Sequence, residues 1–136
     1  MPEIVSLYTI ALLLGGMVFF SFVFSPLVFI KLPAEVAGPF IRSVFPWYFL
    51  AVAVLFGLAT LALLPVSPLW AGVAGLMAAM GIANRQVLMP EINRLRDLQL
   101  GGDAAAGKRF DLLHKGSVAI NMVQMIAAAV LLWHFA

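Results

Sequence analysis

Residues 4–30 of the chain read IVSLYTIALLLGGMVFFSFVFSPLVFI, and this stretch contains no Asp, Glu, Lys or Arg. A helix rises about 1.5 Å per residue and the hydrocarbon core of a bilayer is about 30 Å thick, so about 20 apolar residues cross it. Lys31 ends the stretch with a positive charge. We therefore predict a membrane-spanning helix, kinked near Pro26. Ser21 and Ser25 lie on one face, available for hydrogen bonds to a neighbouring helix.

The rest of the chain has the same apolar character. Of its 136 residues, 64% are hydrophobic and 10% are charged, whereas soluble domains are about half apolar and about a quarter charged. This composition excludes a soluble fold and leaves room for about four spans of about 20 residues, without a separate soluble domain. Because the chain contains no cysteine, disulfides, thiolate metal sites and cysteine nucleophiles are excluded as well.

The predicted fold class is all-α, an integral membrane four-helix bundle that forms one transmembrane domain over residues 1–136. The predicted spans cover residues 4–30, 46–66, 69–90 and 110–133. Prolines interrupt the segment between the first two spans, so we predict a short interfacial helix in this first cytoplasmic loop, with Pro46 starting the second span. Trp47 and Tyr48 are expected in an aromatic belt. The third helix is expected to reach the Gly101-Gly102 break, and Asp103 to cap the last helix.

The basic residues lie on one side of the predicted membrane. Neither terminus nor the turn at 65–68 contains Lys or Arg. The other side contains Lys31, Arg42, Arg94, Arg96, Lys108, Arg109 and Lys115, with Arg85 near the same boundary. By the positive-inside rule, the basic loops are cytoplasmic and both termini are non-cytoplasmic. We expect a multi-pass protein of a cell inner membrane, and the positive charge requires no nucleic-acid partner.

The last predicted span contains polar residues at spacings of three, four and three, which places them on one helix face. They are His114, Ser117, Asn121 and Gln124. Unsatisfied polar groups in hydrocarbon are costly, so this polar stripe must face protein or water. Two interpretations stay open. The stripe forms interhelical hydrogen bonds at about 0.6 kcal/mol each, or it forms a site or pathway for a proton, ion, metal or small polar ligand.

Motifs for enzymatic or metal chemistry are lacking. The chain has no Gly-rich phosphate loop, no paired-His zinc helix and no Gly-x-Ser-x-Gly elbow. Methionines at 17, 77, 80, 89, 122 and 125 would suit copper(I) together with His114, but methionine also fills apolar packing, which is the favoured interpretation. We therefore predict no enzyme activity, no catalytic or metal-binding residue and no cofactor. A metal- or haem-dependent redox protein is the weaker alternative.

A series of proline-aromatic and polar motifs extends over nearly the whole chain. The motifs are Phe24-Ser25-Pro26-Leu27-Val28-Phe29, Leu32-Pro33, Gly38-Pro39-Phe40, Phe45-Pro46-Trp47-Tyr48-Phe49, Ala83-Asn84-Arg85, Pro90-x-x-Asn93 and Phe110-x-x-x-His114-x-x-Ser117-x-x-x-Asn121. In these motifs the chain resembles the transmembrane protein 205-like family, a group of small four-helix membrane proteins with a domain of unknown function. The resemblance implies a four-helix integral membrane protein and no assignable activity.

The resemblance also implies a shared polar cluster near the cytoplasmic boundary. Its candidates are Asn84, Arg85, His114, Ser117 and Asn121, and Gln124 continues the same stripe. Asn84 and Arg85 lie at a depth similar to that of His114, and helix rotations decide which side chains meet. The predicted function is an integral membrane protein that binds or passes a small solute or ion at this cluster. The alternative is a packing or assembly module without a ligand. Expected partners are the lipid bilayer and a second copy of the chain.

Overall fold

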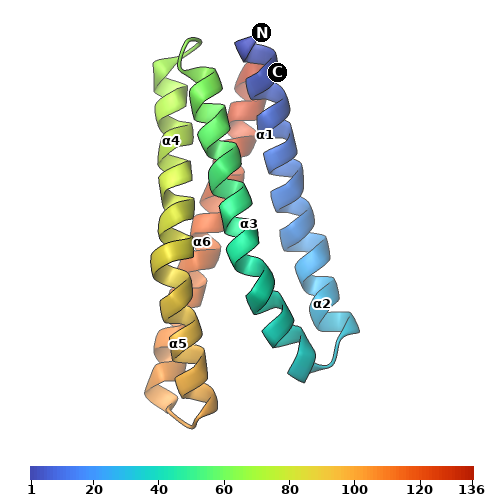
Figure 1. Ribbon diagram of the computed structural model, residues 1–136, viewed down its shortest axis with the longest axis vertical. Helices are drawn as coiled ribbons and strands as arrows, with labels where there is room; N and C mark the ends of the chain where they lie inside the picture. Colours follow the sequence, from blue (N-terminus) through green and yellow to red (C-terminus); the bar gives the residue numbers. More distant parts are fainter.

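The computed structural model describes residues 1–136 as four long antiparallel helices joined by three short connections (Figure 1). The elements are α1 (Pro2–Phe19), η1 (Phe20–Phe24), α2 (Ser25–Lys31), α3 (Ala34–Leu63), α4 (Pro68–Ala83), η2 (Asn84–Leu88), α5 (Met89–Leu100) and α6 (Ala104–Phe135), where η denotes a π-helical turn. Three helices are long and apolar enough to cross a membrane: Pro2–Lys31, Ala34–Leu63 and Ala104–Phe135. The predicted all-α, four-helix class is confirmed.

Both π-helical turns lie just before a proline in a helix that continues. The α1, η1 and α2 segments form one helix with Pro26 in α2, and the α4, η2 and α5 segments form another with Pro90 in α5. A proline lacks the N–H that would bond four residues back, and its ring clashes with that carbonyl. A wider turn ahead of the proline accommodates this loss without ending the helix. The turns also contain Ser21 and Asn84.

The segment before Pro46 differs from the prediction. A separate interfacial helix was expected there, but α3 runs without interruption from Ala34 to Leu63 and includes Pro39 and Pro46. The predicted break was wrong because one proline removes only one backbone hydrogen bond, while the flanking residues keep their helical geometry. Residues on both sides of Pro46 therefore belong to one continuous helix.

The predicted end of the third long helix and the start of the last one are confirmed. Gly102 has φ 102°, a left-handed conformation that glycine adopts without strain. The Ala106 N–H donates to Asp103 Oδ1 at 3.1 Å, which caps the first turn of α6. These two residues reverse the chain between α5 and α6.

The hydrophobic core fills the half of the bundle that contains both termini and the 64–67 turn (Figure 1). Its members come from all four long helices: Ile10, Leu13, Met17, Val52, Phe56, Ala59, Leu63, Ala71, Ala74, Met77, Met125, Ala128 and Leu131. The α3 and α4 helices lie side by side (Figure 1), and small residues meet between them: a Cβ at Gly75 would lie 3.5 Å from Thr60 Cγ2, and one at Gly81 would lie 3.5 Å from Ala53 Cβ.

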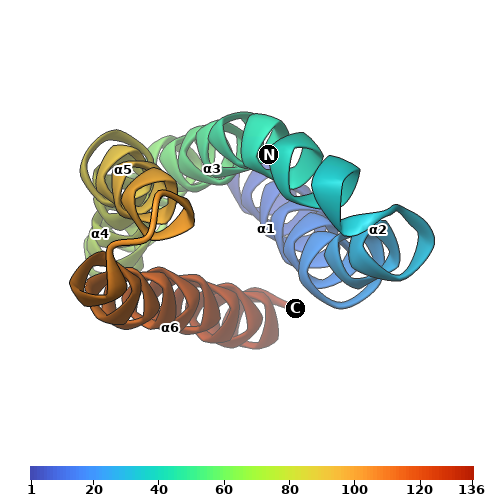
Figure 2. The same ribbon diagram turned by 90° about the horizontal axis from the view of Figure 1, so that it is seen from below.

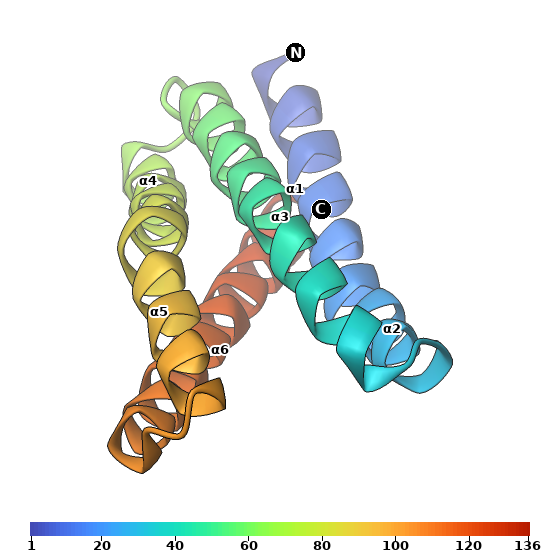
Figure 3. The same ribbon diagram turned by 60° about the horizontal axis from the view of Figure 1, so that its bottom comes forward.

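At the opposite end the helices separate into two pairs, which we call the arms. The first arm is α2 with residues 34–45 of α3, and the second arm is α5 with residues 104–118 of α6 (Figures 2 and 3). Val28, Ala37 and Ile41 form a small cluster inside the first arm, and no hydrophobic cluster joins it to the second. The basic residues lie along the arms, with Arg85 in η2 directly before α5, so we call this end the basic end.

Two leucines of α3 provide a test of the core. Leu63 is fully buried, whereas Leu61 is 65% exposed. We expect Leu63→Ala to lower the free energy of unfolding by about 2–5 kcal/mol, because the variant loses packing and leaves a cavity. Leu61→Ala is expected to cost less than about 0.5 kcal/mol, as for most surface positions. Equilibrium unfolding in detergent micelles measures both values, and equal losses would contradict the assigned core.

Candidate functional site

The polar stripe of α6 enters two different environments. Ser117 and Gln124 are buried, Asn121 is half-buried and His114 is exposed. All four residues lie on one helix face, but the neighbouring helices separate toward the basic end. The stripe therefore passes from a packed interface to an open one.

Asn84 and Ser117 form a buried hydrogen-bonded pair between η2 and α6. Ser117 Oγ donates to Asn84 Oδ1 at 2.7 Å, and Asn84 Nδ2 lies 3.5 Å from the Ser117 carbonyl oxygen. Farther along α6, Gln124 Nε2 donates to the Met77 carbonyl at 2.9 Å. A Cβ at Gly81 would lie 3.2 Å from this Nε2 atom, so glycine leaves room for the bond. These contacts have the geometry of interhelical packing.

Asn121 connects three helices at the level where the core ends. Its Nδ2 donates to Ser21 Oγ in η1 at 3.1 Å, and its Oδ1 accepts from the Tyr48 hydroxyl of α3 at 2.7 Å. The Tyr48 ring stacks on Phe20 with centroids 4.0 Å apart. We call Ser21, Tyr48 and Asn121 the polar trio. Two independent hydrogen bonds and one aromatic stack hold it in place.

Between the polar trio and the basic end, the arms enclose a cleft with a volume of about 1210 Å³. Its walls come from η1, α2, α3, α5 and α6, and about half of its lining residues are hydrophobic. The polar lining residues are Ser21, Ser25, Glu35, Arg42, Ser43, Tyr48, Asn93, Arg96, His114, Ser117 and Asn121. Ligand cavities in proteins usually measure about 300–1,000 Å³, so this cleft is large enough for a small-molecule ligand.

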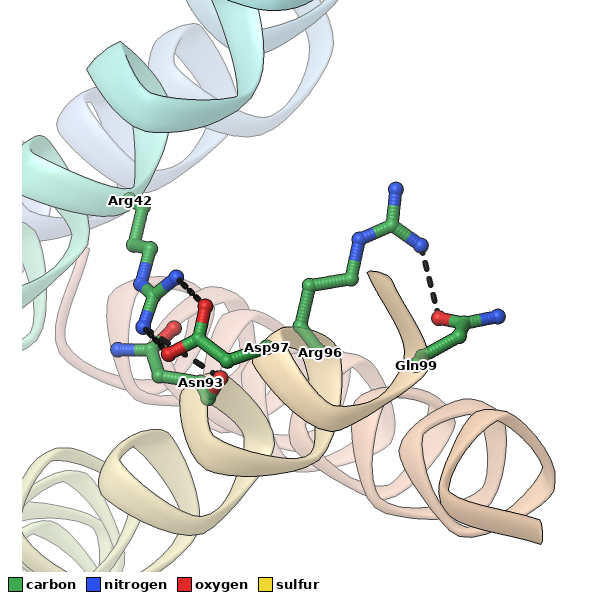
Figure 4. A network of polar contacts seen from close by, with 5 residues as sticks. All are labelled: Arg42, Asn93, Arg96, Asp97 and Gln99. Atoms are coloured by element: carbon green, nitrogen blue, oxygen red, sulfur yellow. Dashed lines mark hydrogen bonds and ion pairs between the residues drawn. The ribbon is translucent and has the colours of Figure 1, made fainter. Parts of the chain in front are cut away.

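An ion pair joins the two arms beside the cleft (Figure 4). Arg42 of α3 donates to both carboxylate oxygens of Asp97 in α5, at 2.7 and 2.9 Å, and one guanidinium nitrogen lies 3.4 Å from the Asn93 carbonyl. The hydrogen bond from Arg42 holds the pKa of Asp97 below its ordinary value, although desolvation acts in the opposite direction. Because both side chains are partly exposed, the pair is a weak link rather than a rigid one.

Arg85 and His114 do not meet. Arg85 Nε donates to the Pro46 carbonyl of α3 at 2.9 Å, while His114 stacks on Phe110 with centroids 5.5 Å apart. The contact of Asn84 or Arg85 with His114 that the sequence allowed is therefore not formed. The rotation of η2 directs Asn84 toward α6 and Arg85 toward α3, and spacing along the chain does not specify this rotation.

Several cleft residues lie outside the predicted cluster. Tyr48 was expected in an aromatic belt, but it is half-buried and bonded to Asn121, whereas the adjacent Trp47 is 71% exposed. Arg42 and Arg96 were interpreted only as markers of topology. The spacing of Ser21 and Ser25 in an apolar helix was the one sequence signal that pointed to this wall of the cleft.

The structure shows no grouping of three or more His, Asp or Glu side chains that could hold a metal ion. Met17, Met77 and Met125 belong to the hydrophobic core, in agreement with the packing interpretation of these residues. Met89 and Met122 are the two methionines that line the cleft.

Comparison with known proteins identifies one family. The family described as Domain of unknown function (DUF4149) matches residues 8–99. No curated protein and no solved structure matches the chain. The matched region contains Ser21, Tyr48 and Asn84, while the polar stripe of α6 lies beyond it.

A double-mutant cycle tests the buried pair. We expect Asn84→Ala and Ser117→Ala to show a coupling energy of about 0.6 kcal/mol and at most about 1.7 kcal/mol, the range for hydrogen bonds between membrane helices. Asn84→Ala combined with Thr9→Ala serves as control, because Thr9 bonds within its own helix. These two effects should add within about 0.5 kcal/mol. Additive effects for the first pair, measured by unfolding in micelles, would contradict the assigned bond.

The ion pair between the arms predicts an acid-dependent loss of stability. The pKa of Asp97 is lowered from its ordinary value of 3.8 in the folded protein, so the pair stabilises above this value and is lost as the pH falls through the lowered pKa. Between about pH 5 and pH 3, the melting temperature of the native chain should therefore fall more than that of Asp97→Asn. Asp111→Asn, which removes an unpaired carboxylate, should behave like the native chain. Identical pH profiles for all three would refute the contribution of this pair.

Proposed function

The chain belongs to the DUF4149 family of unknown function, and from this premise we propose that it is an integral membrane protein that binds or passes a small solute in its cleft. The narrower assignment to the transmembrane protein 205-like family stays a prediction. We further propose a cell inner membrane location, with both termini on the non-cytoplasmic side and the basic end in the cytoplasm. The three apolar helices and the one-sided basic residues support this orientation.

The cleft is the observation that carries the proposal. Asn84, Ser117 and Gln124 are nearly or fully buried and serve as interhelical bonds. Ser117 and Asn121, which also bond between helices, and the exposed His114 line a cleft of about 1210 Å³ that no side chain of the bundle fills. A bundle that needed polar residues only for packing has no use for an open cleft beside them.

The chemistry of the lining favours a solute that can accept hydrogen bonds. The Tyr48 hydroxyl and the Asn121 amide already bond to each other, and Arg42 is paired with Asp97. The His114 ring and the Arg96 guanidinium line the cleft without a carboxylate partner, beside Ser25, Glu35, Ser43 and Asn93. An imidazole donates or accepts, and a guanidinium only donates. A solute with oxygen acceptors matches both groups.

A packing or assembly module is the second candidate. The bond from Gln124 to Met77 favours it for the half of the bundle near the termini, and the Asn84–Ser117 pair favours it where the second arm begins. This candidate leaves the cleft between the arms without a role. Binding of a haem or a metal would have to rely on His114 as the sole histidine at the cleft, so it ranks third.

Single cysteines test whether water reaches the cleft, because the chain has no native cysteine. Ser25 lines the cleft, whereas Val23 is 41% exposed on the other side of the same helix. The thiolate attacks the thiol reagent, and ionisation of the thiol requires water. Ser25→Cys should therefore react with a charged, membrane-impermeant reagent far faster than Val23→Cys. The reaction should proceed in inside-out vesicles and not in right-side-out vesicles. Equal rates for the two variants would exclude a hydrated cleft, and the reverse sidedness would exclude the orientation.

Occupancy of the cleft is tested separately. Small molecules released from the protein purified in mild detergent can be measured by mass spectrometry. A species bound at the cleft should be lost from Asn121→Leu and retained by Gln124→Leu, because Gln124 bonds to Met77 inside the bundle and does not line the cleft. A protein that releases no species, or equal release from both variants, would favour the packing module.

A further inference from the structure

The cleft has an apolar opening on one side. Phe22 of η1, Phe29 of α2, and Val118 and Met122 of α6 all line the cleft, and each is at least 40% exposed. No helix lies between α2 and the start of α6 in the view from below (Figure 2). In a bilayer these exposed apolar residues contact hydrocarbon. The opening therefore joins the cleft to the lipid chains.

The lining at the basic end contains a guanidinium without a carboxylate partner. Arg42 is paired with Asp97, and Arg94 with Glu91, but Arg96 donates only to Gln99 Oε1, at 2.9 Å (Figure 4). Arg96 also lies over a ring, with its Cζ atom 5.3 Å from the Phe110 centroid. A guanidinium on an aromatic face keeps its charge and its remaining donors for an anion.

The balance of charge at the basic end also favours a ligand with one negative charge. Glu3 lies near the amino terminus, so the other five acidic residues and all eight basic residues lie at or near the basic end. The excess is three positive charges. Glu35 also lines the cleft, and like-charge repulsion disfavours a second negative charge on the ligand.

We propose that the cleft binds one anionic phospholipid with a phosphodiester headgroup. Its phosphate lies at Arg96, and one acyl chain lies along the side opening, between Phe29 and Val118. Guanidinium groups bind phosphate oxygens through paired charge-assisted hydrogen bonds, and basic pockets between membrane helices are suited to anionic headgroups. The inference rests on the proposed function, because it names the solute of the same cleft.

The headgroup contact is tested with phosphatidylglycerol and phosphatidylcholine added to the purified protein in a neutral detergent. Phosphatidylglycerol should raise the melting temperature of the native chain more than phosphatidylcholine does, since a ligand that binds the folded state stabilises it. Arg96→Gln should bind phosphatidylglycerol about tenfold more weakly, as expected for the loss of a hydrogen bond between charged groups. Arg94→Gln should keep the native response, because Arg94 is paired with Glu91 and does not line the cleft.

Two results would overturn the headgroup assignment. Equal stabilisation of the native chain by both lipids means that the cleft does not select a headgroup with a net negative charge over a zwitterionic one. If Arg94→Gln and Arg96→Gln weaken the binding of phosphatidylglycerol equally, the lipid binds to the charged surface as a whole. Inorganic phosphate is a third probe, and stabilisation by phosphate alone to the level of phosphatidylglycerol would show that no acyl chain takes part.

The acyl chain contact is tested with matched tryptophan variants. Val118 and Val123 are exposed to similar extents on α6, at 48% and 46%, but only Val118 lines the cleft. Val118→Trp should fill the side opening and abolish the preference for phosphatidylglycerol, and Val123→Trp should retain it. If both variants keep the preference for phosphatidylglycerol, the acyl chain does not lie in the side opening.

Failure of the lipid assignment can be separated from failure of the proposed function. If Ser25→Cys reacts from the basic side and phosphatidylglycerol has no effect, the cleft is a hydrated site for a different solute. If Ser25→Cys is unreactive and the purified protein releases no small molecule, the proposed function fails and the lipid assignment fails with it.

Discussion

The two hydrogen bonds of Asn121 determine how the two halves of this bundle are related. They tie η1, α3 and α6 together where the hydrophobic core ends. An amide at membrane depth must satisfy its donors and acceptors within the protein, so this position fixes the separation of three helices. On one side of Asn121 the helices pack closely. On the other side they diverge, and the cleft begins.

The divergence follows from where the sequence places its small and its bulky residues. Gly75 and Gly81 of α4 allow close contact with α3 in the core half. In contrast, the rings of Phe20 and Phe49 pack against Tyr48 of the polar trio, and Phe45 packs against both. Prolines in α2 and α5 follow π-helical turns that keep each helix continuous. The arms therefore extend as stable helices without a shared core, joined at the basic end by Arg42 and Asp97.

The candidate site was predictable in part. The period of the polar stripe on α6 identified Ser117, Asn121 and Gln124 as inward-facing, and the structure places each against another helix. The prediction did not include Tyr48, because an aromatic residue beside Trp47 near a span end is equally typical of an interfacial belt. Its partner Asn121 lies 73 residues away, and a single sequence contains no signal for a pairing over that separation.

The sequence by itself determined that the helices are apolar enough for a lipid bilayer, how many helices there are, and that the basic residues lie at one end. These features are local, because apolar runs favour lipid and the charges beside them favour water. It also determined the turn at Gly102 and the cap at Asp103, which depend on single residues. Only the tertiary structure decided that α3 passes through Pro46, that Arg85 contacts α3 instead of His114, and that the arms enclose a cleft. These features depend on helix rotations and separations, which are set by packing among all four helices at once.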